Sequence, residues 1–273
     1  MKYTLQSSKY ILKNFIYIFP LALVPAIFFS LSTDGEAVHE VLQMFFDGEM
    51  VHWHFACLFR SISMLSFLSW KSIGFGIAGI IAIIIFGSWI IALLEKHMRI
   101  GKRTYNGIFS KINDNLMPVF QYTVAILLIY EIWALLTTSI LFVVSRIPIV
   151  ALAYLCIVSA FVGMHFVLLY AVGLIYLWLP CMQITGFKAG EALSYSNKIS
   201  APVQIKIMFG QTLSLLLVEF LVCLCIWLLK SNEFMVISTI LYAIIIMSFC
   251  VRMEIAYFDL DHIQRADLKK YYH

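Results

Sequence analysis

Charged side chains are scarce in this sequence. Asp, Glu, Lys and Arg make up 12% of the 273 residues, and 62% of the residues are hydrophobic, whereas an average soluble domain carries about a quarter charged residues. The mean hydropathy is +0.93. A water-soluble fold of this composition would lack the polar side chains needed to cover its surface, so we expect an integral membrane protein.

Sequence motifs for chemistry are also missing. There is no recognisable nucleophile, no phosphate-binding loop and no metal-ligand motif such as His-Glu-x-x-His. The six cysteines lie mostly in apolar stretches, and the spacing of Cys223 and Cys225 is not that of a Cys-x-x-Cys motif. The sequence therefore predicts no catalytic residue, no cofactor and no bound metal, and it indicates inert membrane cysteines.

Six charge-poor stretches are long enough to cross the ~30 Å hydrocarbon core of a bilayer as helices. They cover residues 15–31, 73–94, 118–144, 147–179, 207–229 and 234–257. We expect an all-α, polytopic membrane helical bundle in which residues 1–273 form a single integral membrane domain. The first stretch follows three lysines, as in a signal peptide, but we expect it to be retained as an anchor.

The positions of Lys and Arg predict the orientation of the chain. Of the 19 basic residues, 15 fall on one side of the predicted spans, and the other side receives Arg60, Lys71, Arg146 and Lys230. Because basic residues accumulate in cytoplasmic loops, we expect both termini in the cytoplasm. Two short passes within the charge-free run 147–187 would divide the basic residues almost evenly. We therefore expect one long helix there, which ends before Pro180.

Residues 32–72 form the only sizeable segment that we place outside the cytoplasm. Apolar residues recur in it at helical spacing, so we expect two short amphipathic helices lying on the outer surface. The segment contains His39, His52 and His54, which are residues of a type common in zinc sites. Helical residues two apart point in different directions and no ligand motif accompanies them, so we favour histidines without a metal.

A basic cluster follows the second predicted span and consists of Lys96, Arg99, Lys102 and Arg103. Such clusters favour anionic lipid headgroups. A simpler interpretation is that the cluster only sets the topology. In a membrane chain Lys and Arg mainly set orientation, so the net charge of +4 does not call for nucleic acid. We expect the lipid bilayer as the main partner, together with a protein partner or a second copy of the chain.

An internal repeat is a further hypothesis. Ser110-Lys111-Ile112-Asn113 precedes the third span and Asn197-Lys198-Ile199-Ser200 precedes the fifth, with a looser counterpart in Ser8-Lys9-Tyr10-Ile11. Three tandem units, each an amphipathic helix followed by a helix hairpin, would explain six spans. The matches are short, and chance is a serious rival explanation.

Three ionisable residues fall near the centres of predicted spans, namely Glu131, His165 and Glu219. Ionisable groups in a bilayer are costly, so they should face protein or water and find partners. Tyr154 and Tyr176 share one helical face with His165, since residues 11 apart are about three turns apart. These five residues form the candidate mid-membrane polar site.

Three interpretations of this site stay open. The glutamates could be neutral and hydrogen-bonded between helices, which would fix the packing. They could instead form a Glu-His-Glu group that relays protons or binds a cation or a polar substrate. A metalloenzyme using the same residues is the weakest interpretation, since no nucleophile and no open metal site accompany them.

Three sequence blocks carry a resemblance to a known family. The blocks ALLEKHMRIGKRT (92–104), LWLPCMQITG (177–186) and ALSYS (192–196) resemble an uncharacterised family of six-span integral membrane proteins from low-GC Gram-positive bacteria. The resemblance covers nearly the whole chain and extends more distantly to the membrane domain attached to some glycerophosphodiester phosphodiesterases. It implies a multi-pass protein of the bacterial plasma membrane and transfers no catalytic residue.

Three functions follow as hypotheses. The first is a non-enzymatic membrane scaffold or accessory subunit, in which the central glutamates are structural. The second is a small proton-coupled transporter or channel that uses Glu131, His165 and Glu219, and it requires a polar cavity that reaches all three. The third is an intramembrane enzyme that acts on lipid, which requires a groove open to the bilayer.

Overall fold

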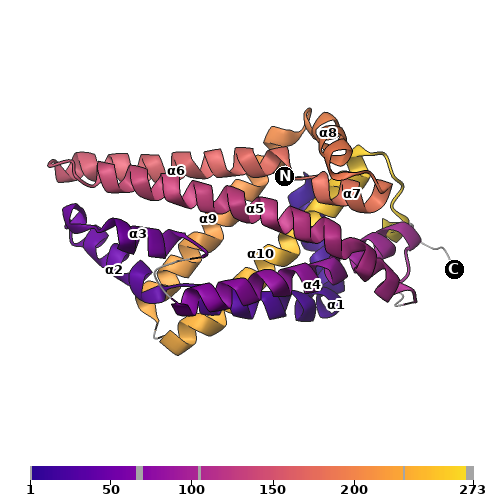
Figure 1. Cartoon of the computed structure of the whole chain (residues 1–273), viewed down its shortest axis with the longest axis horizontal. Helices are drawn as coiled ribbons and strands as arrows, with labels where there is room; N and C mark the ends of the chain where they lie inside the picture. Colours follow the sequence, from indigo (N-terminus) through magenta and orange to yellow (C-terminus); the bar gives the residue numbers. More distant parts are fainter. Residues whose placement is uncertain (1, 66–69, 104–105, 230, 269–273) are drawn as a thin grey trace.

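The computed structural model describes residues 2–65, 70–103, 106–229 and 231–268, and helices are the only regular elements in these ranges (Figure 1). The α-helices are α1 Lys2–Ser32, α2 Gly35–Phe46, α3 Phe55–Ile62, α4 Trp70–Ile100, α5 Ile108–Val144, α6 Val150–Leu174, α7 Trp178–Thr185, α8 Ala189–Ser200, α9 Gln204–Leu228 and α10 Ser231–Leu260. Two short 3₁₀ helices cover Met50–His52 and Ala266–Leu268.

The predicted all-α membrane bundle with six spans is confirmed. Within the described ranges, six helical stretches are long and apolar enough to cross a bilayer. Five of them are α1, α4, α5, α9 and α10, and the remaining stretch joins α6 to α7. Helices are the expected solution, because a lipid-exposed backbone has no water to bond with and must satisfy its polar groups internally.

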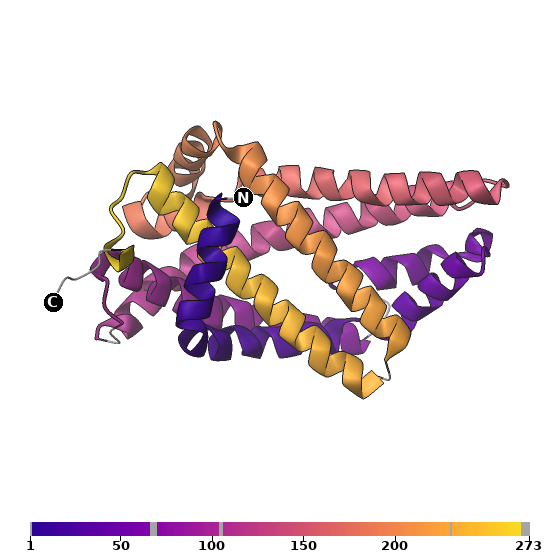
Figure 2. The ribbon, with the colours of Figure 1, turned by 180° about the vertical axis from the view of Figure 1, so that it is seen from behind.

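The six spans close into a ring in the order of the chain. Helix α1 packs against α4, α4 against α5, α5 against α6, α6 against α9 and α9 against α10, and α10 returns to α1. Figure 2 shows the closing side, where the indigo α1 crosses the yellow α10. Short connections explain why α4 and α5, α5 and α6, and α9 and α10 are neighbours in space.

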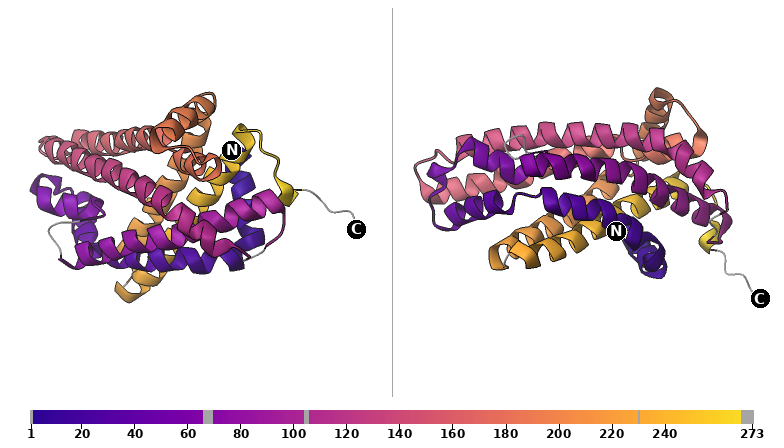
Figure 3. Two further views of the ribbon diagram at one scale, coloured as in Figure 1. Left: turned by 45° about the vertical axis from the view of Figure 1, so that its right-hand side comes forward. Right: turned by 60° about the horizontal axis from the view of Figure 1, so that its bottom comes forward.

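Shorter helices enter the two ends of this ring. At one end α2 packs against α9 and α3 against α5, and at the other end α7 packs against α5 and α10. Both views of Figure 3 place the α2–α3 segment beside the ends of α5 and α6, and α7 and α8 at the opposite end. The ring is therefore filled from both ends by segments that do not cross the bilayer themselves.

The α2–α3 segment corrects one expectation. The two predicted helices are present, but they stand against the bundle rather than lying on its outer surface. Their apolar faces are buried in it: Val38 packs near Val218 and Val222, and Trp53 and Leu58 join a separate cluster. The amphipathic pattern correctly predicts two helices, but protein covers their apolar faces.

The fourth span corrects another expectation, because residues 147–179 do not form one continuous helix. Helix α6 ends at Leu174, and α7 begins at Trp178 with Pro180 near its start. The turn between them is tight, with the Ile175 amide donating to the Val172 carbonyl at 3.2 Å. Proline lacks an N–H and clashes with the carbonyl of the residue four positions earlier, but it fits a first turn. The chain therefore starts a new helix just before Pro180.

Helix α1 bends at Asn14, whose φ and ψ of −118° and 15° are not helical. The buried side-chain amide of Asn14 donates to the Tyr10 carbonyl at 2.9 Å. After the bend α1 approaches α4 closely, since a Cβ at Gly79 would lie 2.7 Å from the Phe29 ring. Glycine allows this contact, so α1 and α4 form the first hairpin of the ring despite the 37 residues between them.

The three-unit repeat stays a prediction. The hairpins α1–α4, α5–α6 and α9–α10 match the proposed units, and each is a pair in contact. The amphipathic stretches before them differ, because α8 is a separate helix whereas the counterparts before the first and third spans are continuous with α1 and α5.

An ion pair fixes the start of the α2–α3 segment and gives a first test. Asp34 accepts from the Ala37 amide at 3.1 Å as the N-cap of α2, and its other oxygen binds Arg60 Nε and Nη2 at 2.9 and 2.6 Å. The hydrogen bond to Asp34 raises the pKa of Arg60, so the guanidinium stays charged at any ordinary pH.

We expect Asp34→Ala to destabilise the detergent-solubilised protein by roughly 1–2 kcal/mol, because it removes both the helix cap and the Arg60 partner. Thermal unfolding measured by tryptophan fluorescence reports the change. Glu36→Ala is the matched control, since Glu36 is exposed in the first turn of the same helix. Equal midpoints for the two variants would contradict the role of Asp34.

Candidate functional site

Glu131 joins α5 to the end of α3. Its carboxylate accepts from Ser63 Oγ at 2.7 Å, from the Met64 amide at 3.1 Å and from the Leu65 amide at 2.9 Å. The neighbouring Tyr130 hydroxyl donates to the Ile62 carbonyl at 2.8 Å. Residues that leave a helix carry unpaired amides and carbonyls, and α5 supplies partners for both kinds. Glu131 is therefore committed to holding the α2–α3 segment against α5.

His165 and Glu219 meet, as the sequence hypothesis required. His165 Nε2 lies 2.7 Å from Glu219 Oε2, so α6 and α9 are joined by a side-chain pair inside the bundle. His165 Nδ1 lies 2.8 Å from the Phe161 carbonyl. A carbonyl only accepts, so Nδ1 carries a proton, and one further proton lies between Nε2 and the carboxylate. Whether this proton sits on His165 or on Glu219, the pair has no net charge, so burying it costs less free energy than burying a charge.

The ring of His165 is enclosed by aromatic side chains. Trp133 lies against it edge-on with centroids 4.9 Å apart, and Phe161 lies at 4.4 Å. The indole of Trp133 also donates to the Met164 carbonyl at 2.6 Å. The His165 side chain is 0% exposed, whereas that of Glu219 is 30% exposed. The glutamate is thus the member of the pair that other molecules can reach.

The two tyrosines of the predicted face do not join this pair. The Tyr154 hydroxyl donates to the Phe45 carbonyl in α2. The Tyr176 hydroxyl accepts from Gln211 Nε2 at 2.7 Å, and Gln211 in turn accepts from Arg252 Nη1 at 2.8 Å. The shared helical face is real for Tyr154 and His165 within α6, but Tyr176 follows the break after Leu174. A three-turn spacing cannot be carried across that break.

The candidate polar site therefore divides into separate contacts. Glu131 binds the 63–65 turn, His165 binds Glu219, and the two tyrosines bind groups elsewhere. The expectation that all five residues face one site is not met by their hydrogen bonds.

A second set of buried charges lies toward the opposite end of the spans. Glu95 in α4 is 1% exposed and binds Lys111 of α5, Arg99 at 3.1 Å and Gln183 of α7 at 2.9 Å. It therefore ties three helices together. The sequence does not predict this contact, because Glu95 falls just outside the predicted span 73–94.

Arg252 and Glu254 of α10 are also buried, contrary to what their position in the sequence suggests. They stand near the end of the last span, where long side chains commonly reach the interface, yet they are 3% and 0% exposed. Arg252 donates to Gln211 and to Ser214 Oγ, the latter at 3.3 Å. Neither carboxylate oxygen of Glu254 has a hydrogen-bond partner among the described residues. Sequence position cannot distinguish these buried residues from charged residues that reach the interface, because it is the packing of α1, α4 and α7 that covers them.

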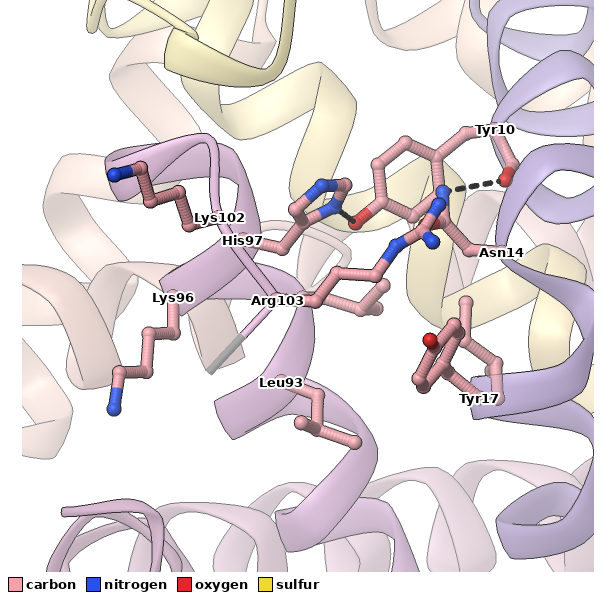
Figure 4. Close-up of a pocket in the computed structure, with 10 residues that line it drawn as sticks. Tyr10, Asn14, Tyr17, Leu93, Lys96, His97, Lys102 and Arg103 are labelled. Carbon is pink, nitrogen blue, oxygen red and sulfur yellow. Dashed lines mark hydrogen bonds between the residues drawn. The ribbon is translucent and has the colours of Figure 1, made fainter. Parts of the chain in front are cut away.

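The predicted basic cluster separates into two groups. Arg99 turns inward to Glu95, and Lys96, Lys102 and Arg103 line a small pocket between α1 and α4 (Figure 4). Arg103 Nε donates to Asn14 Oδ1 at 2.9 Å, and its guanidinium lies 4.8 Å from the centroid of the Tyr17 ring. Arg99 thus pairs with Glu95 and does not line the pocket, although its side chain is 48% exposed, and Asn14 and Tyr17 join the lining without any signal in the sequence.

The histidines and cysteines of the α2–α3 segment lie apart from any metal-like cluster. Within the described ranges, no group of three or more His, Cys, Asp or Glu side chains could hold a metal. His39 stacks on Trp227 with centroids 5.4 Å apart. Burial raises the pKa of Cys57 to about 12, aided by the nearby Glu40 carboxylate. Its thiol therefore stays protonated and unreactive at physiological pH.

No protein-family model, curated protein or solved structure matches the chain. The resemblance to six-span proteins of low-GC Gram-positive bacteria therefore stays a prediction, and the geometry of the site has to carry the argument about function.

The three donors on Glu131 generate a second test. We expect Glu131→Gln to destabilise the protein by roughly 1–3 kcal/mol, because one acceptor oxygen becomes a donor and leaves a buried amide or hydroxyl unsatisfied. Unfolding in a graded denaturing detergent measures the change. Ser139→Ala on the same helix is the control, since Ser139 is partly exposed and its hydroxyl donates to the Leu135 carbonyl of its own helix. A Glu131→Gln variant as stable as this control would contradict the capping role.

The His165–Glu219 pair generates a third test, a double-mutant cycle. We expect His165→Gln and Glu219→Gln each to destabilise the protein and the double variant to lose less than their sum. Polar pairs between membrane helices couple by about 0.6 kcal/mol on average and by up to about 1.7. The same unfolding assay gives all four corners of the cycle. Strict additivity would mean that the two side chains do not interact in the protein.

Proposed function

We propose that this chain is a non-enzymatic membrane scaffold or accessory subunit, resident in a bacterial plasma membrane with both termini in the cytoplasm. One observation carries the proposal: each polar residue of the candidate site is bound by protein groups on another segment of the chain. Groups used in this way fix how helices pack. A substrate path would instead need several of them around one common space.

The strongest support comes from Glu131. A transporter built on Glu131, His165 and Glu219 needs all three to take part in binding or proton transfer. The carboxylate of Glu131 already accepts from two backbone amides and one hydroxyl. Releasing it would leave the end of α3 without partners, so ligand binding there would compete with the fold itself. The same argument disfavours a lipid-acting enzyme that uses Glu131.

The orientation rests on charge and on the way the two ends meet. Lys2 Nζ binds Asp259 at 2.8 and 3.0 Å, and the Tyr3 hydroxyl also donates to Asp259, at 2.8 Å. The start of α1 and the end of α10 therefore lie at the same end of the bundle. This agrees with six crossings and with the 15 of 19 basic residues that fall on one side. The positive-inside rule then favours cytoplasmic termini.

Proton-coupled transport is the second candidate function, and one specific observation favours it. The His165–Glu219 pair holds an exchangeable proton, and Glu219 is 30% exposed although it lies in the middle of α9. A partly accessible carboxylate that shares a proton with a buried imidazole is a natural proton acceptor. This candidate uses two of the three residues originally grouped together.

A flux assay separates the two functions. The purified protein is placed in liposomes that enclose a pH-sensitive dye, and a proton gradient and a membrane potential are imposed. We expect proton entry no faster than in protein-free liposomes, with a protonophore as the positive control. Entry that is faster than this background and is abolished in Glu219→Gln, but kept in Ser139→Ala, would overturn the scaffold proposal in favour of transport.

The scaffold role also makes a positive prediction. In membranes solubilised with a mild detergent, we expect the chain to migrate in a defined assembly heavier than its own 31.3 kDa plus bound detergent. Native electrophoresis followed by identification of the co-migrating chains measures this. Migration as a monomer under conditions that preserve known membrane complexes would contradict a scaffold or accessory role.

A further inference from the structure

The small pocket between α1 and α4 is built at the end of the bundle that is richest in basic residues. Figure 4 shows its residues, which come from α1 on one side and from the end of α4 and the following loop on the other. The lining residues are Tyr10, Asn14, Tyr17, Ile18, Leu93, Leu94, Lys96, His97, Lys102 and Arg103. The pocket exists because α1 bends at Asn14, which turns the first part of α1 away from α4.

Arg103 is held in a fixed position at this pocket. Its Nε binds Asn14 Oδ1, its Nη2 donates to the Lys13 carbonyl at 3.1 Å, and its plane lies over the Tyr17 ring. Asn14 is itself 4% exposed and locked to the Tyr10 carbonyl. The described part of the chain gives Arg103 no carboxylate partner. A guanidinium oriented in this way presents its remaining N–H donors to a planar or tetrahedral anion.

Other basic side chains raise the positive potential at the mouth of the pocket. Lys96 and Lys102 extend outward from the side of His97 that faces away from Arg103 (Figure 4). Lys96 binds the Asn106 carbonyl, and Lys102 forms no ion pair with a described residue. Of the acidic residues nearby, Asp267 is paired with Arg265 at 2.7 Å and Glu95 with Arg99 and Lys111, which leaves Glu254, on the far side of Tyr10, as one carboxyl group against three basic side chains. The excess charge of the site is therefore positive.

Apolar features accompany the charge. Ile18, Leu93 and Leu94 form walls of the pocket. On the face of α1 opposite the pocket, Leu12 is 78% and Ile16 is 81% exposed, in the same turns as the exposed Lys9 and Lys13. A helix that exposes large apolar residues beside lysines is typical of the membrane interface, where acyl chains cover the former and headgroups the latter. A free anion would gain nothing from these apolar surfaces.

We infer that the pocket between α1 and α4 binds the headgroup of an anionic phospholipid. Arg103 contacts the phosphate, and Lys96 and Lys102 attract it. The apolar walls formed by Ile18, Leu93 and Leu94 contact the glycerol backbone and the first carbons of the acyl chains. Seated in this way, the lipid connects the bent N-terminal part of α1 to the end of α4. The inference goes beyond the scaffold role and does not depend on the outcome of the flux assay.

Delipidated protein in an uncharged detergent provides the test. Phosphatidylglycerol, phosphatidylcholine, inorganic phosphate or glycerol phosphate is titrated in, and the thermal unfolding midpoint is followed, since a ligand that binds the folded state raises it. We expect phosphatidylglycerol alone to raise the midpoint in a saturable way. An equal rise with phosphatidylcholine would overturn the requirement for anionic charge. A rise with inorganic phosphate or glycerol phosphate as large as that with the lipid would show a free-anion site instead.

Matched variants locate the effect. A basic residue near a membrane surface contributes ~1 kcal/mol, so removing one should weaken phosphatidylglycerol binding about fivefold. We expect this loss in Lys102→Gln, a larger loss in Arg103→Gln, and no change in Lys198→Gln, which removes the same charge from the exposed face of α8. If Arg103→Gln does not fold, Lys102→Gln decides. Equal weakening in Lys102→Gln and Lys198→Gln would overturn the site in favour of diffuse charge attraction.

Discussion

The capping of α3 by α5 is the contact on which the end of the bundle that holds the α2–α3 segment depends. In a bundle with so few charges, a chain that leaves a helix near the hydrocarbon core exposes amides and carbonyls that water cannot reach. Tyr130 and Glu131 are consecutive on α5 and satisfy both kinds of group, the carbonyl of Ile62 and the amides of Met64 and Leu65. Together with the bond from the Tyr154 hydroxyl to the Phe45 carbonyl, they hold the α2–α3 segment in the ring of spans.

The opposite end of the ring is organised by charge rather than by backbone capping. Glu95 gathers Lys111 and Gln183, so that α4, α5 and α7 are joined at one carboxylate. Helix α7 lies there because the fourth span breaks before Pro180. The break therefore brings Gln183 to the buried Glu95. Arg252 and its amide partner Gln211 extend the same polar layer toward α9. The middle of the bundle between these layers is mainly apolar and aromatic, with the His165–Glu219 pair as a neutral exception.

The proposed functions depend on which polar groups these contacts leave free to bind other molecules. Glu131 is used by the fold, whereas Glu219 keeps an accessible edge and Arg103 keeps unpaired donors at the membrane interface. A protein whose polar groups mostly stabilise helix contacts, and whose remaining charge faces lipid, is suited to holding a place in the membrane and presenting surfaces to other molecules. The scaffold proposal and the lipid site follow from this distribution, and proton exchange at Glu219 is the alternative that the same distribution allows.

The sequence alone determined the class of this protein and the number of its spans, because low charge and long apolar stretches are properties of composition and length. It also determined that Glu131, His165 and Glu219 need partners, since burial of ionisable groups is costly in any bilayer fold. Which partners they have was decided by tertiary structure. Glu131 could not be matched to residues 63–65, because that contact depends on the α2–α3 segment standing against α5. Glu95, Arg252 and Glu254 resemble interfacial residues by position, and only the folding back of α7 and the bend of α1 at Asn14 bury them.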